Sequence, residues 1–77
     1  MIADEHGLIW RQQRRDIDQR YGGECIVRVC QQYPRVTQVV QRPNREAEWV
    51  TTFHVEGIAA QHWPTAAEAI AAARENP

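Results

Sequence analysis

Hydrophobic and polar residues alternate along the middle of the chain, as they do in β-strands. ECIVRVCQQ, residues 24–32, is rich in β-branched side chains, and VTQVVQR, residues 36–42, lies between two prolines that limit it. EWVTTFHV, residues 48–55, alternates most regularly. Glu56 and Gly57 then form a predicted hairpin turn before IAAQHW, residues 58–63. We therefore expect an antiparallel sheet of three or four strands.

Two segments outside these strands have helical patterns. In WRQQRRDIDQRY, residues 10–21, Trp10, Ile17 and Tyr21 fall within one narrow helical stripe, and two glycines follow as a stop. Thr65 and Glu68 form a capping box at the start of AAEAIAAARE, residues 66–75. A helix this short is not stable alone in water, so we expect it to pack on the sheet. The predicted fold class is α+β, in the order α-β-β-(β)-β-α, with residues 1–77 as one domain.

The composition is that of a small folded protein. Of the 77 residues, 43% are hydrophobic and 25% are charged, which argues against a disordered chain. No apolar run approaches the roughly 20 residues that a membrane-spanning helix needs. The first residues, MIADEHG, lack the basic and apolar pattern of a signal peptide. We expect a cytoplasmic protein from a bacterium or a bacterial mobile element.

The net charge of −1 hides an uneven distribution. Residues 6–45 contain eight Arg against three acidic residues, which gives +5, whereas residues 46–77 contain one Arg against five Glu, which gives −4. Such a division is typical of a basic surface for an acidic partner, or of two halves that attract each other in the fold. Internal neutralisation is the interpretation we favour for so small a domain.

The residues that usually carry chemistry do not gather in the sequence. Cys25 and Cys30 are five positions apart, so a regular strand places them on opposite faces, where they neither bridge each other nor share a metal ion. The predicted hairpin register likewise sends His54 and His62 to opposite surfaces. No catalytic triad, phosphate loop or zinc-binding motif is present. We therefore predict no catalytic residue, no metal and no cofactor, and keep a small enzyme with a motif-free active site as the least favoured hypothesis.

The order of elements resembles the layout of double-stranded-RNA-binding domains over nearly the whole chain. In that family the last helix begins with a lysine-rich, phosphate-binding stretch, whereas the matching residues here are Ala66, Ala67, Glu68 and Ala69. A sheet followed by TAAEAIAAA is also similar to antitoxins of the HicB type. Neither resemblance is specific enough to assign a family.

One set of residues points to binding. Arg11, Arg14 and Arg15 lie on one flank of the predicted N-terminal helix, Leu8 and Ile9 fall outside its apolar stripe, and Trp63 is predicted on the outer surface of the hairpin. We predict a non-catalytic interaction module that uses these residues to bind another protein or itself. An inhibitor, an antitoxin or an accessory factor of a mobile element would fit this description. The alternative is nucleic-acid binding through the same arginines.

Overall fold

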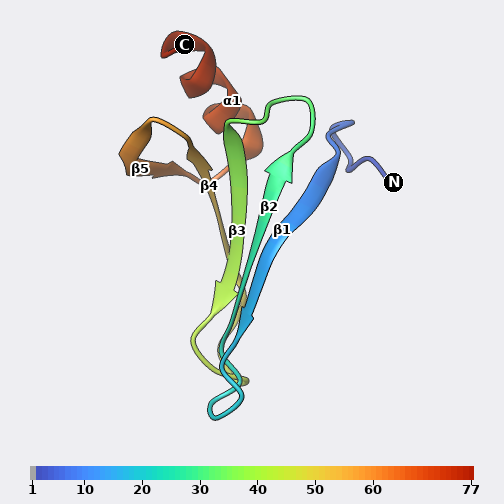
Figure 1. The fold of residues 1–77 in the computed structure, drawn as a ribbon, viewed down its shortest axis with the longest axis vertical. Coiled ribbons are helices and arrows are strands. Elements are labelled where there is room, and N and C mark those ends of the chain that lie inside the picture. Colours follow the sequence, from blue (N-terminus) through green and yellow to red (C-terminus); the bar gives the residue numbers. More distant parts are fainter. Residues whose placement is uncertain (1) are drawn as a thin grey trace.

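Five antiparallel strands form a single sheet in the computed structural model, which describes residues 2–77. The elements are β1 (Trp10–Ile17), β2 (Glu24–Cys30), β3 (Val36–Arg42), β4 (Val50–Val55), β5 (Ile58–Trp63) and the helix α1 (Ala66–Glu75). Each strand pairs with its neighbours in sequence, so the strand order is β1-β2-β3-β4-β5 (Figure 1). The α+β class and the C-terminal helix are confirmed. The sheet has more strands than predicted, and residues 2–77 contain no N-terminal helix.

The prediction of a helix over residues 10–21 is wrong, because Trp10–Ile17 is the edge strand β1 and pairs with β2. A β-bulge between Gln12 and Arg14 explains the error. The bulge adds one residue to the strand, so the alternation of side chains changes phase in its middle and the period-two signal is lost. Arg and Gln also favour helices intrinsically, and only the pairing with β2 overrides that preference.

The glycines that were expected to end this helix lie in the β1–β2 turn. Gly22 has a positive φ of 76°, and its N–H donates to the carbonyl of Asp18 at 2.7 Å. The Asp18 carboxylate accepts from the backbone N–H of Arg20 at 3.0 Å, so it shapes the turn. A hairpin turn therefore accounts for the signals that we interpreted as a helix terminus.

Local signals predicted the C-terminal half well. β3 has the predicted bounds, and Glu56 and Gly57 form the turn between β4 and β5, with Gly57 at a φ of 93°. The helix α1 begins after its N-cap Thr65, whose hydroxyl oxygen accepts from the N–H of Glu68 at 3.3 Å. The Glu68 carboxylate accepts from that hydroxyl at 3.1 Å, where a complete capping box would use the backbone N–H of Thr65.

The register of β5 differs from the predicted one. Val55 pairs with Ile58 as expected, but the next pair is Phe53 with Trp63, so β5 advances five residues while β4 advances two. Three extra residues in β5 therefore change which face each later side chain occupies. Trp63 packs against the core cluster and not on the outer surface, which corrects its predicted position.

The core lies at one end of one face of the sheet. Its buried residues are Cys30, Val36, Phe53, Val55 and Ala69. By the strand register, Cys30, Val36, Phe53 and Val55 point to the same side of the sheet. Ala69 of α1 completes the cluster that they form. Figure 1 shows α1 at one end of the sheet, with the β1–β2 turn and the β3–β4 loop at the opposite end. The helix thus covers only part of the surface that the sheet presents.

Candidate interaction surface

The strand register divides the side chains of the sheet between two faces. One face carries the strand residues of the core and receives α1. The other face, called the open face below, contributes no residue to the core cluster, and no helix of residues 2–77 packs on it. A sheet normally buries at least one face, and a second apolar face that stays uncovered is a candidate binding surface.

Three cross-strand rows make up the open face on β1 to β4. The first row is Arg11, Val29, Thr37 and His54, the second is Arg14, Val27, Val39 and Thr52, and the third is Asp16, Cys25, Gln41 and Val50. The β1 margin is charged, the centre on β2 and β3 is mainly apolar, and the β4 margin is mainly polar. An apolar centre with a polar rim is the usual arrangement of a protein interface.

The charges of the open face are confined to β1. Arg14 Nε lies 2.9 Å from Asp16 Oδ2, and both side chains are more than 60% exposed, so water screens this pair strongly. Among residues 2–77, no acidic oxygen lies within 4 Å of the Arg11 guanidinium. On the β1 margin, Arg14 is therefore paired with Asp16, whereas Arg11 lacks an acidic partner among residues 2–77.

Two histidines lie near each other at the β4 margin. The rings of His54 and His62 have centroids 5.9 Å apart, which corrects the prediction that they point to opposite surfaces. Partial burial and, secondly, the neighbouring His62 lower the pKa of His54 below its usual value of about 6.5. Nε2 of His54 lies 3.0 Å from the Thr52 hydroxyl. His54 is therefore neutral at pH 7 and offers hydrogen bonding without charge.

The predicted binding residues do not form one surface. Arg11 and Arg14 share the open face, and Ile9 lies two positions before Arg11 on the same side of the chain. Leu8 and Trp63 pack against the core on the helix-bearing face. The sequence prediction placed Arg11, Arg14, Leu8 and Ile9 on or beside one helix and Trp63 on the outer surface of the hairpin. The sheet separates these residues, because successive strand residues point to opposite faces.

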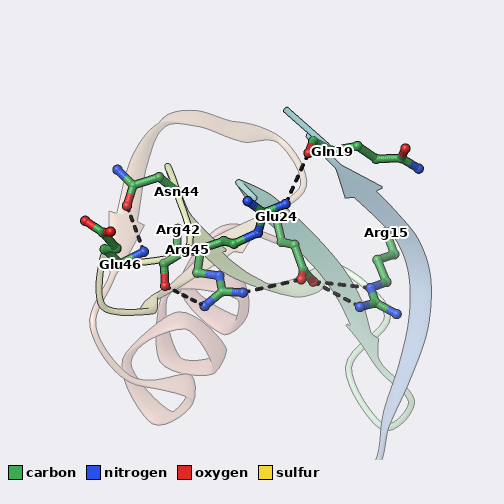
Figure 2. A network of polar contacts seen from close by, with 7 residues as sticks. All are labelled: Arg15, Gln19, Glu24, Arg42, Asn44, Arg45 and Glu46. Carbon is green, nitrogen blue, oxygen red and sulfur yellow. Dashed lines mark hydrogen bonds and ion pairs between the residues drawn. The ribbon is translucent and has the colours of Figure 1, made fainter. Parts of the chain in front are cut away.

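Arg15 also lies on the helix-bearing face, where it belongs to an ion-pair network (Figure 2). Its Nη2 is 3.1 Å from one oxygen of Glu24, and Nη2 of Arg42 is 3.6 Å from the other oxygen. The Arg42 guanidinium lies 4.5 Å from the centre of the Trp49 ring. The network joins β1, β2 and β3 at the end of the sheet that α1 does not cover. The Glu24 side chain at its centre is only 15% exposed. The Arg15 side chain therefore takes part in this network, and its use in binding stays a prediction.

The residues that the sequence prediction missed are the central valines, Val27, Val29 and Val39. β2 carried a signal for them, because the run Cys25–Val27 is apolar at successive positions and not only at alternate ones. Such a strand is typical of a sheet that is covered on both faces. Residues 2–77 supply a cover, α1, for one face only.

Comparisons with protein-family models, curated proteins and solved structures found no match for this chain. Within residues 2–77, no helix has the length and apolar character needed to cross a membrane. The same residues contain no group of three His, Cys, Asp or Glu side chains placed to hold a metal ion. Cys25 and Cys30 are free thiols on opposite faces of β2, as predicted.

Proposed function

We propose that this protein is a non-catalytic interaction module that binds another polypeptide through the open face. The valines at the centre of that face, which are half-buried and on which no helix of residues 2–77 packs, are the observation that carries the proposal. Val27 and Val39 are cross-strand neighbours, and Val29 adjoins them on β2. Burial of apolar surface is the main favourable term in protein association, and these three side chains offer it at the centre of a polar rim.

The shape of the molecule supports the same proposal. The radius of gyration is 13.2 Å, compared with about 11.5 Å for a typical compact domain of this length. The molecule measures 40 × 31 × 18 Å, so it is flat. A flat chain with a core at one end buries little apolar surface by itself. A partner on the open face would add a second layer and the burial that goes with it.

Nucleic-acid binding is the second candidate, because Arg11 and Arg14 lie on the open face. Sheets that bind single strands present aromatic side chains on which bases stack, and the rows of the open face contain no Phe, Tyr or Trp. The net charge of −1 also gives little attraction for phosphates. These two observations favour a protein partner over a nucleic acid.

A substitution at the centre of the open face tests the proposal. We expect Val39→Asp to abolish capture of the partner from nuclease-treated extract of the source organism, because binding would bury a charge without a counterion. Thr51→Asp is the matched control, since Thr51 is exposed on β4 and faces the helix-bearing side. Circular dichroism melts would establish that both variants fold. If Val39→Asp does not fold, the milder Val39→Thr takes its place in the capture experiment. Equal capture by Val39→Asp and the unsubstituted protein would contradict the proposal.

The arginines separate the two candidates. For a nucleic acid, the joint change Arg11→Ala and Arg14→Ala would reduce the slope of affinity against salt concentration, whereas for a protein partner no gel shift occurs even at low salt. Arg15→Ala is the control, because Arg15 lies on the other face. A salt-dependent shift of single-stranded or duplex DNA or RNA that requires Arg11 and Arg14 would replace the protein partner by a nucleic acid.

A further inference from the structure

We infer that the partner is a second copy of this chain, packed open face against open face about a two-fold axis that crosses the strands at the second row. This inference rests on the proposed function and adds the identity of the partner. Sheets that pack face to face keep their strands within about 30° of each other and lie about 10 Å apart, so the side chains of the two inner faces interdigitate.

The charges of β1 select this axis. A two-fold axis across the strands reverses the order of the rows, so the first row of one copy covers the third row of the other. Arg11, which has no acidic partner among residues 2–77 of its own chain, then faces Asp16 of the second copy, and symmetry forms this pair twice. Arg14 faces its own equivalent at the exposed margin, where each Arg14 keeps the contact with Asp16 of its own chain and remains screened by water.

The apolar centre is self-complementary about the same axis. Val27 faces Val27 of the second copy, Val39 faces Val39, and Val29 faces Cys25. Small and β-branched side chains allow two sheets to approach closely. At the β4 margin His54 faces Val50, which is 54% exposed in the single chain, and the lowered charge of His54 reduces the cost of covering it.

The other two-fold arrangement lacks this match. An axis parallel to the strands places β1 of one copy over β4 of the other, so Arg11 faces His54 and Asp16 faces Val50. Both charges would then lose water without gaining an opposite charge. The charge pattern therefore favours the axis across the strands.

Charge reversal tests the pairing. We expect the unsubstituted protein to sediment at twice its 8.9 kDa chain mass and each of Arg11→Asp and Asp16→Arg to weaken the dimer at least tenfold. The double variant should restore most of the affinity, because it exchanges the two charges across the axis. Arg11 and Asp16 are about 13–16 Å apart along β1, so restoration within one chain does not explain that result. Gln12→Asp, exposed on the helix-bearing face of β1, is the control that should leave the mass unchanged.

Cysteine cross-linking tests the geometry. In a Cys25→Ser background, Val27→Cys should form a disulfide-linked dimer under mild oxidation, whereas Thr51→Cys, on the other face, should not. Val29→Cys with Cys25 retained should also cross-link two chains, since positions 25 and 29 of one strand are about 13 Å apart and cannot form a disulfide. A linked dimer from Thr51→Cys but not from Val27→Cys would overturn the inference.

The outcomes separate this inference from the proposed function. A chain that stays monomeric at millimolar concentration, yet captures a different protein in a Val39-dependent way, overturns the second copy as partner and leaves the proposed function standing. A monomer that captures no protein through Val39 overturns both. A dimer that persists in Val39→Asp lies on another surface and also overturns the inference.

Discussion

His54 and His62 show how the fate of a residue depends on pairing far along the chain. The extra residues in β5 bring the two rings to a centroid distance of 5.9 Å, although a regular hairpin would separate them. Histidine side chains are common metal ligands, but here the effect of His62 on His54 is electrostatic. Partial burial of His54 and, secondly, the neighbouring His62 make protonation of His54 less favourable.

The lowered pKa of His54 predicts a loss of stability in mild acid. The unfolded chain protonates His54 near pH 6.5 while the folded chain does so only at lower pH, so the free energy of unfolding should fall as pH falls from 7 to 5. Urea denaturation at several pH values measures this slope. His62→Gln removes the neighbouring charge and should make the slope smaller, whereas His6→Gln, at a side chain that is 72% exposed, should not. An identical slope in His62→Gln would contradict the coupling.

At the scale of elements, two connections hold the sheet together at the end that α1 does not reach. The backbone N–H of Arg45, in the β3–β4 loop, donates to the carbonyl of Tyr21 at 3.1 Å, and Arg45 Nη2 donates to the carbonyl of Gln19 at 3.2 Å. The Arg45 side chain passes over Gly22, where a Cβ atom would overlap it. The β1–β2 turn and the β3–β4 loop therefore pack as one unit (Figures 1 and 2).

Gly22→Ala should destabilise the fold by about 1–3 kcal/mol, because it adds both a strained backbone and a clash with Arg45. Gly7→Ala is a matched control, since Gly7 has a φ of 77° but open space around it, and it should cost only the backbone part. Chemical denaturation measures both changes. Arg45→Ala introduced with Gly22→Ala should recover the clash part of the loss. Equal losses for Gly7→Ala and Gly22→Ala would contradict the packing of the two connections.

The elements that could be predicted are those whose signals are local. The bounds of β3, the cap Thr65 and the turn at Gly57 depend on residues within a few positions of each other, and the structure confirms them. β1 could not be predicted, because the bulge near Gln12 hides its alternation and its strand geometry comes from β2. The candidate surface was found only in part. Arg11 was identified by its charge. The face to which it points, however, depends on how β1 pairs in the sheet, and α1 covers the opposite face.

At the scale of the whole molecule, the uneven position of the core predicts an uneven stability. Cys30 and Val36 are fully buried in the core cluster that includes Ala69 of α1, whereas Ile17, Tyr21, Trp49 and Val50 at the other end are exposed. Backbone hydrogen bonds open more easily where few apolar contacts cover them. The two ends of the same strands therefore differ in local stability.

Amide hydrogen exchange should show this gradient along β2 and β3. We expect the amides near Cys30 and Val36 to exchange at least tenfold more slowly than those near Glu24 and Arg42, because only the first pair belongs to the buried core cluster. Two-dimensional NMR after transfer to deuterated buffer measures each amide. The variant Ala69→Gly, within α1, should reduce the difference by loosening the helix. Uniform protection along both strands would contradict a core confined to one end.

The two edges of the sheet determine how far association can proceed. β1 is interrupted by its bulge and carries charged side chains, and the ladder between β4 and β5 is broken after its first pair. Irregular and charged edges offer no continuous row of backbone groups to a further strand, so they oppose growth of the sheet from chain to chain. The apolar valines lie on the open face and not at an edge of the sheet. One bound partner covers that face and leaves no apolar surface there for a further chain. The protein should therefore remain free of fibrils at concentrations where its binding surface is fully occupied.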